Sequence, residues 1–209
     1  MSTLIRFDSS PMGESSISRK LTTKFVETWR KTHSGGKVIE RDLTTLGLKP
    51  IDVIWLAAIQ TPEAALTKEQ KEAIALSDSL IAELQQADEY VFGVPMHNFS
   101  IPSTLKLWID QIVRGGKTFA YGGADGPKGL LTGKKATVLI ASGGVYGQES
   151  ALAAFNFVAP YLRTMFGFLG VTDVTIISAE GTAQLRSGKV DVQEFLAPTL
   201  EKVHTHASH

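Results

Sequence analysis

The sequence predicts a three-layer α/β domain built on a doubly wound, five-stranded parallel sheet. Segments typical of strands and of helices alternate five times along the 209 residues. The central strand segments are continuous apolar runs, which is the pattern of strands buried on both faces of a sheet. The chain shows no internal repeat, low-complexity tract or linker. We therefore expect residues 1–209 to form one domain.

Most of the expected strands are short runs rich in apolar residues and bounded by glycine, proline or small polar residues. The first begins almost at the N-terminus and ends at a small polar cluster, Asp8-Ser9-Ser10-Pro11. The expected strands are residues 4–7, 37–42, 90–94, 136–141 and 171–178.

Helices are expected after these strands. Ile17, Leu21, Phe25 and Trp29 recur every four residues, which is typical of an amphipathic helix. Thr67 and Gln70 resemble a capping box that opens a helix running to about residue 86. The remaining helices are expected from Pro102 to about 113, over 149–168 with Pro160 inside it, and over 190–204.

Two stretches are expected to be less regular than the rest of the chain. Residues 44–66 contain the breakers Gly47, Pro50 and Pro62, and their apolar patch needs a partner surface to cover it. Residues 117–134 form a long glycine-rich loop.

Composition excludes several classes of protein. The 21 basic residues balance the 21 acidic ones, so no electrostatic attraction to nucleic acid or to an anionic membrane is expected. The chain has no cysteine, which excludes disulfides, thiolate catalysis and cysteine-bound metal, and no metal site is expected. It has no signal-peptide pattern at Met1 and no apolar run approaching the roughly 18 residues of a membrane span. A cytoplasmic protein is expected.

Ligands bind beyond the carboxyl ends of the strands in such a sheet, near the point where the strand order reverses. The loop after the first strand is serine-rich and leads into a helix, where hydroxyls and free backbone N–H groups favour a phosphate. One N-cap would explain Ser16 or Ser18, but not serines on both sides of the turn.

The loops after the third and fourth strands are also unusual. Residues 95–102 place His97, Asn98 and Phe99 between two prolines, which suits a flat ring with polar edges, although a rigid connection without a ligand would also explain them. An acid–base role for His97 is disfavoured, since a lone loop histidine is more often structural. Gly143 and Gly144 allow the backbone to approach a ligand closely, or form an ordinary turn.

Together these segments resemble the family of FMN-dependent NADH-azoreductases, also described as FMN-dependent NADH:quinone oxidoreductases, which are similar to flavodoxin in fold. The resemblance covers most of the chain. It rests on residues 18–21, 95–99, 118–121, 129–136, 160–162, 167–171 and 179–181.

The resemblance implies a flavodoxin-like fold, FMN as cofactor and NADH as electron donor. It implies that the FMN phosphate is held by Ser10, Ser16, Ile17 and Ser18. It also implies contacts to the flavin ring from the two other loops, namely from Pro95, Met96, His97, Asn98, Phe99, Ala141, Ser142, Gly143 and Gly144. Many members have tyrosine in place of His97 and an arginine in the glycine loop, so we expect altered donor or acceptor preference rather than loss of flavin.

The expected reaction is a two-electron reduction of quinones or aromatic azo compounds, with hydride passing through N5 of FMN and no catalytic side chain. One shared site for donor and acceptor predicts ping-pong kinetics. Backbone N–H groups of Asn98 and of the Gly143–Gly144 turn are expected to stabilise negative charge on the reduced flavin. The expected acceptor pocket is walled by Phe99, Phe119, Tyr121 and Met165.

A homodimer is expected, because residues 149–168 carry more apolar surface than one sheet face needs and the resemblance also implies a dimer, although core packing alone would also explain this surface. Only the resemblance implies a preference for NADH over NADPH as the electron donor. A flavodoxin-type electron carrier is disfavoured by the zero net charge, since carriers are usually strongly acidic. The sequence does not exclude a non-catalytic flavin-binding protein. A receiver domain is disfavoured because this chain lacks the acidic pair of that class, and a nucleotide-binding enzyme is disfavoured because no glycine motif follows the first strand.

Overall fold

The computed structural model describes residues 1–123 and 126–208. In this part of the chain five parallel strands form the main sheet, in the order β2-β1-β3-β6-β7. This order confirms the predicted doubly wound sheet. The strands are β1 (Thr3–Asp8), β2 (Lys37–Asp42), β3 (Glu89–Pro95), β6 (Lys135–Ala141) and β7 (Asp173–Ala179).

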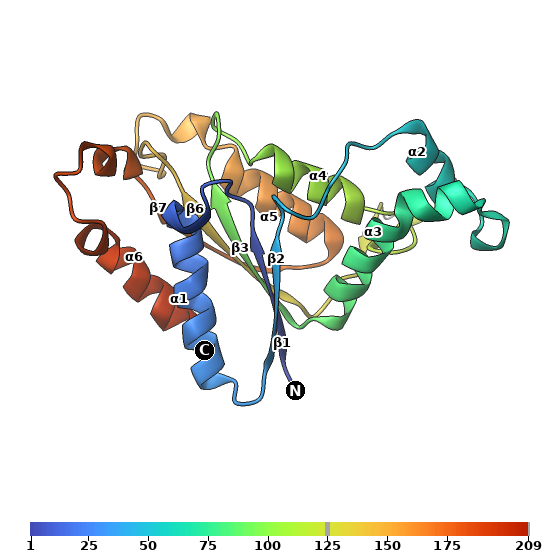
Figure 1. Cartoon of the computed structure of the whole chain (residues 1–209), viewed down its shortest axis with the longest axis horizontal. Helices are drawn as coiled ribbons and strands as arrows, with labels where there is room; N and C mark the ends of the chain where they lie inside the picture. Colours follow the sequence, from blue (N-terminus) through green and yellow to red (C-terminus); the bar gives the residue numbers. More distant parts are fainter. Residues whose placement is uncertain (124–125, 209) are drawn as a thin grey trace.

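Helices cover both faces of the sheet (Figure 1). Helices α1 (Ile17–Thr32) and α6 (Val192–Ala207) lie on one face, and α3 (Lys68–Gln86), α4 (Ser103–Ile112) and α5 (Val158–Leu169) lie on the other. The predicted capping box of Thr67 and Gln70 opens α3. The chain goes from β2 at one edge to β3 on the other side of β1, so the strand order reverses between β1 and β3. The loops after these two strands are therefore neighbours.

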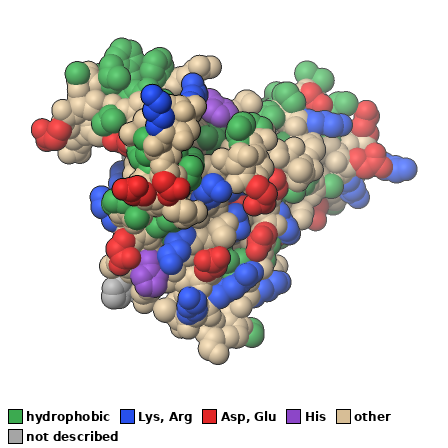
Figure 2. All heavy atoms as spheres, turned by 60° about the vertical axis from the view of Figure 1, so that its left-hand side comes forward, with side chains coloured by type: hydrophobic (Ala, Val, Ile, Leu, Met, Phe, Trp, Pro, Cys, Tyr) green, Lys and Arg blue, Asp and Glu red, His purple; other side chains and the backbone are tan. Residues whose placement is uncertain are grey.

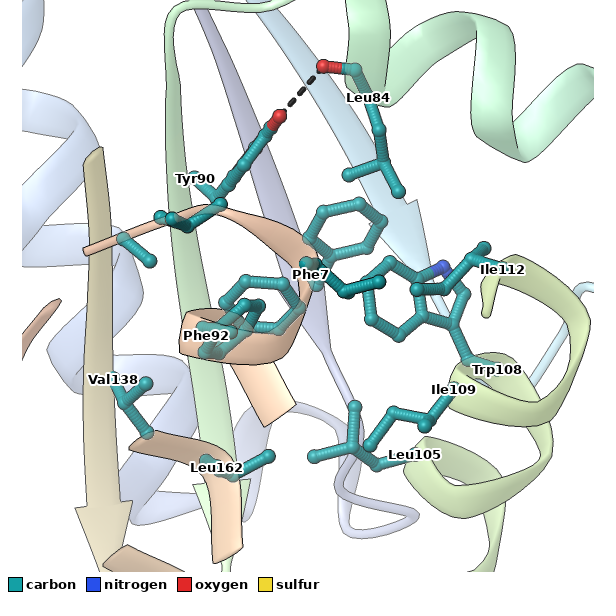
Figure 3. Packing of buried hydrophobic residues seen from close by; sticks show 14 of the residues in the cluster. Phe7, Leu84, Tyr90, Phe92, Leu105, Trp108, Ile109, Ile112, Val138 and Leu162 are labelled. Carbon is teal, nitrogen blue, oxygen red and sulfur yellow. Dashed lines mark hydrogen bonds between the residues drawn. The ribbon is translucent and has the colours of Figure 1, made fainter. Parts of the chain in front are cut away.

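The core beneath α3, α4 and α5 contains a group of packed aromatic rings among aliphatic side chains (Figure 3). The rings of Phe7 and Phe92 stack with their centroids 4.7 Å apart, and the Trp108 ring lies 4.8 Å from Phe7. Tyr90 donates its buried hydroxyl to the Leu84 carbonyl at 2.6 Å. Burial raises the pKa of Tyr90, with a smaller contribution from Asp88, so this phenol stays protonated and keeps its hydrogen bond.

Residues 44–66, which were predicted to be less regular, contain one short α-helix, α2 (Val53–Gln60). Asp52 caps this helix by accepting from the Trp55 N–H at 2.8 Å. The Trp55 ring is buried on Ile74 of α3, and its Nε1 donates to Gln111 of α4 at 2.9 Å. Helices α3 and α4 therefore cover Trp55 of the apolar patch, whereas Ile51, Val53 and Leu56 stay 37–79% exposed.

The helix predicted over residues 149–168 is wrong in its first half. A single 3-10 turn, Ala153–Phe155, precedes α5, which begins at Val158. Pro160 lies in the first turn of α5, where its missing N–H costs no intrahelical hydrogen bond. The predicted loop over 117–134 also contains a short antiparallel hairpin of β4 (Phe119–Ala120) and β5 (Lys128–Gly129).

Charged side chains of both signs are interspersed over the side of the molecule that carries α1 and α6, which Figure 2 brings forward. This mixture agrees with the balanced composition. None of the helices formed by the described residues combines the length and the apolar character that crossing a membrane requires.

Candidate functional site

The loop after β1 places a group of buried hydroxyls at the N-terminus of α1. Ser16 caps this helix by accepting from the Arg19 N–H at 3.3 Å, and its Oγ lies 3.1 Å from the Ser18 Oγ. Ser10 Oγ accepts from the Met12 N–H at 3.3 Å. Because the accepting hydroxyls of Ser10 and Ser16 keep their protons, both can still donate. The N–H groups of Ile17 and Ser18 lie in the first helical turn and have no intrahelical acceptor.

These donors form what we call the hydroxyl cradle: Ser10, Ser16, Ile17 and Ser18. Its chemistry, neutral hydroxyls and backbone N–H groups at a helix N-terminus, fits a phosphate. Ser18 has no exposed surface, so its hydroxyl supports that of Ser16 instead of facing solvent.

Asp8 ends β1 directly before the cradle and is 5% exposed. Its carboxylate lies 2.7 Å from the Arg6 Nε and accepts from the Thr22 hydroxyl at 2.8 Å. Burial raises the pKa of Asp8 against the lowering effects of Arg6, Thr22 and Arg19. Asp8 is thus part of the frame beneath the cradle and not a donor in it.

The loop after β3 is a tight turn with unusual backbone angles. His97 and Ser100 exchange two backbone hydrogen bonds of 3.0 Å, which close a two-residue hairpin. Asn98 and Phe99 between them have φ of 46° and 69°. These angles are typical of a type I′ turn, but an aromatic residue in the left-handed region is strained. Such strain is concentrated at functional sites, so we take this turn as part of one.

The glycine loop after β6 is held through its carbonyl groups. Those of Ser142, Gly143 and Gly144 accept from the N–H groups of Thr182, Ala183 and Gly181 at 3.0–3.1 Å. In a trans peptide the next N–H points opposite to the carbonyl. The N–H groups of Gly143 and Gly144 therefore point away from the β7 loop and remain available to a ligand.

Glu180 also belongs to this site, although no role was predicted for it from the sequence motif of residues 179–181. Its carboxylate accepts from the N–H groups of Tyr146 and Gly147 at 3.0 and 3.2 Å. It thereby ties the far end of the glycine loop to the end of β7. Its place directly after a strand, at the edge where ligands bind, is the signal that could have identified it.

An aromatic wall stands beside the strained turn. The Phe99 ring lies 5.1 Å from that of Phe155 and 6.1 Å from that of Tyr146, and the Phe99 carbonyl accepts from the Phe157 N–H at 3.1 Å. Phe99, Phe155 and Phe157 are 43–55% exposed. Both Phe155 and Phe157 lie within residues 149–168, the segment whose apolar surface led us to expect a helical dimer interface. They lie here because the chain forms a turn before α5.

The other predicted pocket residues are not brought to Phe99 within one chain. The Phe119 ring packs on Phe168 near the end of α5, with centroids 4.8 Å apart, and Tyr121 beside it is 84% exposed. This hairpin lies by the amino ends of the strands, since Leu131 donates to the carbonyl of Leu169. Met165 lies midway along α5 and is partly buried against the core.

A groove of about 890 Å³ lies along the outer side of α1, between β2 and α6. Its lining contains none of the predicted flavin contacts and is dominated by charged side chains of both signs, including Arg6, Glu27, Glu40 and Lys24. A flavin ring needs a mostly apolar surface. The three loops at the carboxyl ends of β1, β3 and β6, and not this groove, are therefore the candidate site.

The strand order and the loops at its reversal define a doubly wound protein of the flavodoxin-like class. The chain belongs to the family described by the flavodoxin-like fold, whose model matches residues 2–205. Within that class it belongs with the FMN-dependent NADH:quinone oxidoreductases. It is 53% identical over 209 residues to a protein of that name from Acidobacterium capsulatum, covering all of both chains. It is 48% identical over 200 residues to one from Burkholderia lata, covering 96% of each.

Solved structures agree with this assignment. An azoreductase from Bacillus anthracis superposes with a TM-score of 0.88 at 30% identity, covering 100% of this chain and 99% of that one. An FMN-dependent NADH-azoreductase from the same species, solved in complex with FMN, gives a TM-score of 0.87 at 29% identity and covers 99% and 98%.

Proposed function

We propose that this protein is an FMN-dependent oxidoreductase that uses NADH to reduce quinones and aromatic azo compounds. The observation that carries the proposal is the meeting of three specialised loops at adjacent strand ends. They are the hydroxyl cradle, the strained turn 97–100 and the glycine loop with its free N–H groups. The names of the relatives point to the same cofactor and the same donor.

The residues present fit FMN. The cradle offers uncharged donors to a phosphate, and the N–H groups of Gly143 and Gly144 offer donors to the polar edge of a flavin ring. FMN, when bound, supplies the two-electron redox chemistry. Met96, which donates its N–H to the Ala141 carbonyl at 2.8 Å, joins the loops that would hold the ring.

The protein's own part in the reaction is positioning and exclusion of water. The wall of Phe99, Phe155 and Phe157 offers an apolar surface to a planar donor or acceptor. We propose that donor and acceptor use this surface in turn, which predicts ping-pong kinetics. Donors aimed at the flavin by the glycine loop would stabilise negative charge without reorganising.

Two departures from the family pattern bear on selectivity. His97 is exposed, and Ser142 stands in the glycine loop where many members carry arginine. Ser142 is buried and donates its hydroxyl to the Gly144 carbonyl at 2.9 Å, so it stabilises the loop instead of presenting a charge. We propose that these changes shift donor or acceptor preference and leave flavin binding intact.

We propose a cytoplasmic homodimer. Phe119 and Tyr121 lie at the opposite end of the sheet from Phe99, so they can wall the acceptor surface only if a second copy contributes them. A sedimentation-equilibrium mass of two chains would support this arrangement, and a monomer that turns over at the dimer's rate would contradict it.

The deciding experiment is an anaerobic absorption titration of the purified protein reconstituted with FMN. We expect the flavin to stay bound through gel filtration, to be bleached by NADH and to recover its absorbance on addition of a quinone. Retained flavin that NADH cannot bleach would favour an electron carrier or a non-catalytic flavin-binding protein. A protein that retains no flavin would contradict the proposed function.

A further inference from the structure

Arg19 connects three elements beneath the cradle. Its Nη2 donates to the Ser10 carbonyl at 2.9 Å, and its Nε lies 3.4 Å from the same oxygen. The same Nη2 lies 2.5 Å from Asp42 Oδ2 at the end of β2, and Nη1 lies 3.9 Å from Asp8 at the end of β1. The Arg19 side chain is only 16% exposed.

Asp42 is itself fixed. It accepts from the Thr44 N–H at 3.0 Å and from the Thr44 hydroxyl at 2.6 Å. The guanidinium of Arg19 is thus anchored on a carboxylate that is already ordered. Its planar fork can then hold one carbonyl in a defined direction, which a flexible ammonium cannot do.

The direction of the Ser10 carbonyl matters for an anion. An oxygen lone pair facing a phosphate repels it, whereas a carbonyl turned toward Arg19 has its charge compensated. Ser10 precedes Pro11, whose nitrogen carries no proton, so this peptide can offer the phosphate no N–H in exchange. Only the Ser10 hydroxyl can donate there, and its direction follows from that of its backbone.

We propose that Arg19 is a positioning residue for phosphate recognition. It turns the Ser10 carbonyl away from the hydroxyl cradle and aims the Ser10 hydroxyl into it. It acts through Ser10, because its Nε and Nη2 donate to the Ser10 carbonyl and the Asp42 carboxylate, and its Nη1 faces the Asp8 carboxylate at 3.9 Å. The inference rests on the proposed function, since it takes FMN as the ligand.

The test compares FMN with riboflavin, which has the same ring and no phosphate. Dissociation constants of both are measured by flavin fluorescence for the wild type, Arg19→Ala and Arg19→Lys. We expect Arg19→Ala to raise the dissociation constant of FMN by about tenfold, which is the effect of losing one charge-assisted hydrogen bond. The dissociation constant of riboflavin should stay nearly unchanged. Arg19→Lys should recover only part of the loss, because it keeps the charge and lacks the fork.

Arg30→Ala is the matched control. Arg30 lies on the same helix and pairs with Glu40 at 3.3 Å, but it is exposed and remote from the cradle. It should change neither constant. If Arg19→Ala does not fold, Asp42→Asn, which removes the charge of the anchor, should shift the same ratio of constants in the same direction.

If Arg19→Ala weakened the binding of FMN and of riboflavin equally, Arg19 would have a general structural role and the inference would be overturned. Full recovery by lysine would also overturn it, because charge alone would then suffice. A wild type that binds neither flavin, by contrast, would contradict the proposed function itself.

Discussion

Phe99 shows how one residue can conflict with its own backbone. Asn98 before it is well suited to the left-handed region, whereas Phe99 at φ of 69° is not, and glycine is the residue that such a turn favours there. Its ring meets Phe155 and Tyr146 at the exposed edge of the site. We infer that the aromatic ring is retained for ligand contact at the expense of a relaxed turn.

Comparing Phe99→Gly with Phe99→Ala tests this inference. Both remove the ring, but only glycine removes the left-handed penalty, so Phe99→Gly should be more stable to urea by about 1 kcal/mol. Both variants should raise the KM for a quinone by a similar factor. Equal stability of the two variants would show that the turn is not strained.

At the scale of elements, the cradle depends on how closely α1 approaches the sheet. Gly93 of β3 pairs with Asp8 of β1 beneath the first turn of α1. A Cβ at Gly93 would lie 2.7 Å from Asp8 Oδ1 and 3.1 Å from the Ser18 carbonyl oxygen. Only a residue without a side chain allows this contact between helix and strand.

Gly93→Ala should therefore lower the free energy of unfolding by about 1–3 kcal/mol and weaken FMN binding, because the first turn of α1 must shift. Gly167→Ala is the control. Nothing lies within 4 Å of a Cβ at Gly167, which is in α5, so this variant should be stabilised by about 0.5–1 kcal/mol. Thermal and urea unfolding measure the stability of both variants. If Gly93→Ala left the free energy of unfolding unchanged, the close approach of α1 to β3 would be refuted.

For the whole molecule, two carboxylates near the cradle respond oppositely to pH. For Asp42, burial acts to raise the pKa, but hydrogen bonds from Thr44 and Arg19 outweigh it and hold the pKa below its usual 3.8. Asp42 therefore stabilises the fold above pH 3.8, and this contribution is lost as pH falls through the lower folded value. The pKa of Asp8 is raised, chiefly by burial, so stability falls as pH rises from 3.8 through that raised value.

Asp42→Asn should be less stable than the wild type at pH 6, on the order of 1 kcal/mol. The difference should shrink as pH drops below 3.8, because the unfolded wild type then binds a proton at Asp42 and the folded wild type does so at its lower pKa. Urea unfolding at a series of pH values measures it. A difference for Asp42→Asn that is independent of pH would contradict the assignment.

The sequence alone was sufficient for the sheet and for the loops at the carboxyl ends of its strands. Continuous apolar runs are dictated by burial on both faces, and glycine, proline and serine mark turns and caps through their own backbone preferences. These local rules located all five strands, the capping box at Thr67 and the serine-rich start of α1. The family motifs then supplied the cofactor, which no local rule could.

Tertiary structure decided what depends on contacts between distant segments. Helix α2 is eight residues long and exists because Trp55 finds a buried place on α3 and a partner in Gln111. The turn before α5 moves Phe155 and Phe157 to the site, and Phe119 and Tyr121 lie at the other end of the sheet.

The roles of Arg19 and Glu180 likewise belong to the folded chain. Arg19 reaches a carbonyl nine positions away and a carboxylate 23 positions away, and Glu180 accepts from N–H groups more than 30 positions earlier. Residue type and spacing encode propensity and burial. They do not encode which distant backbone group a charged side chain will meet, because that is settled only when the strands align and bring their carboxyl ends to one edge.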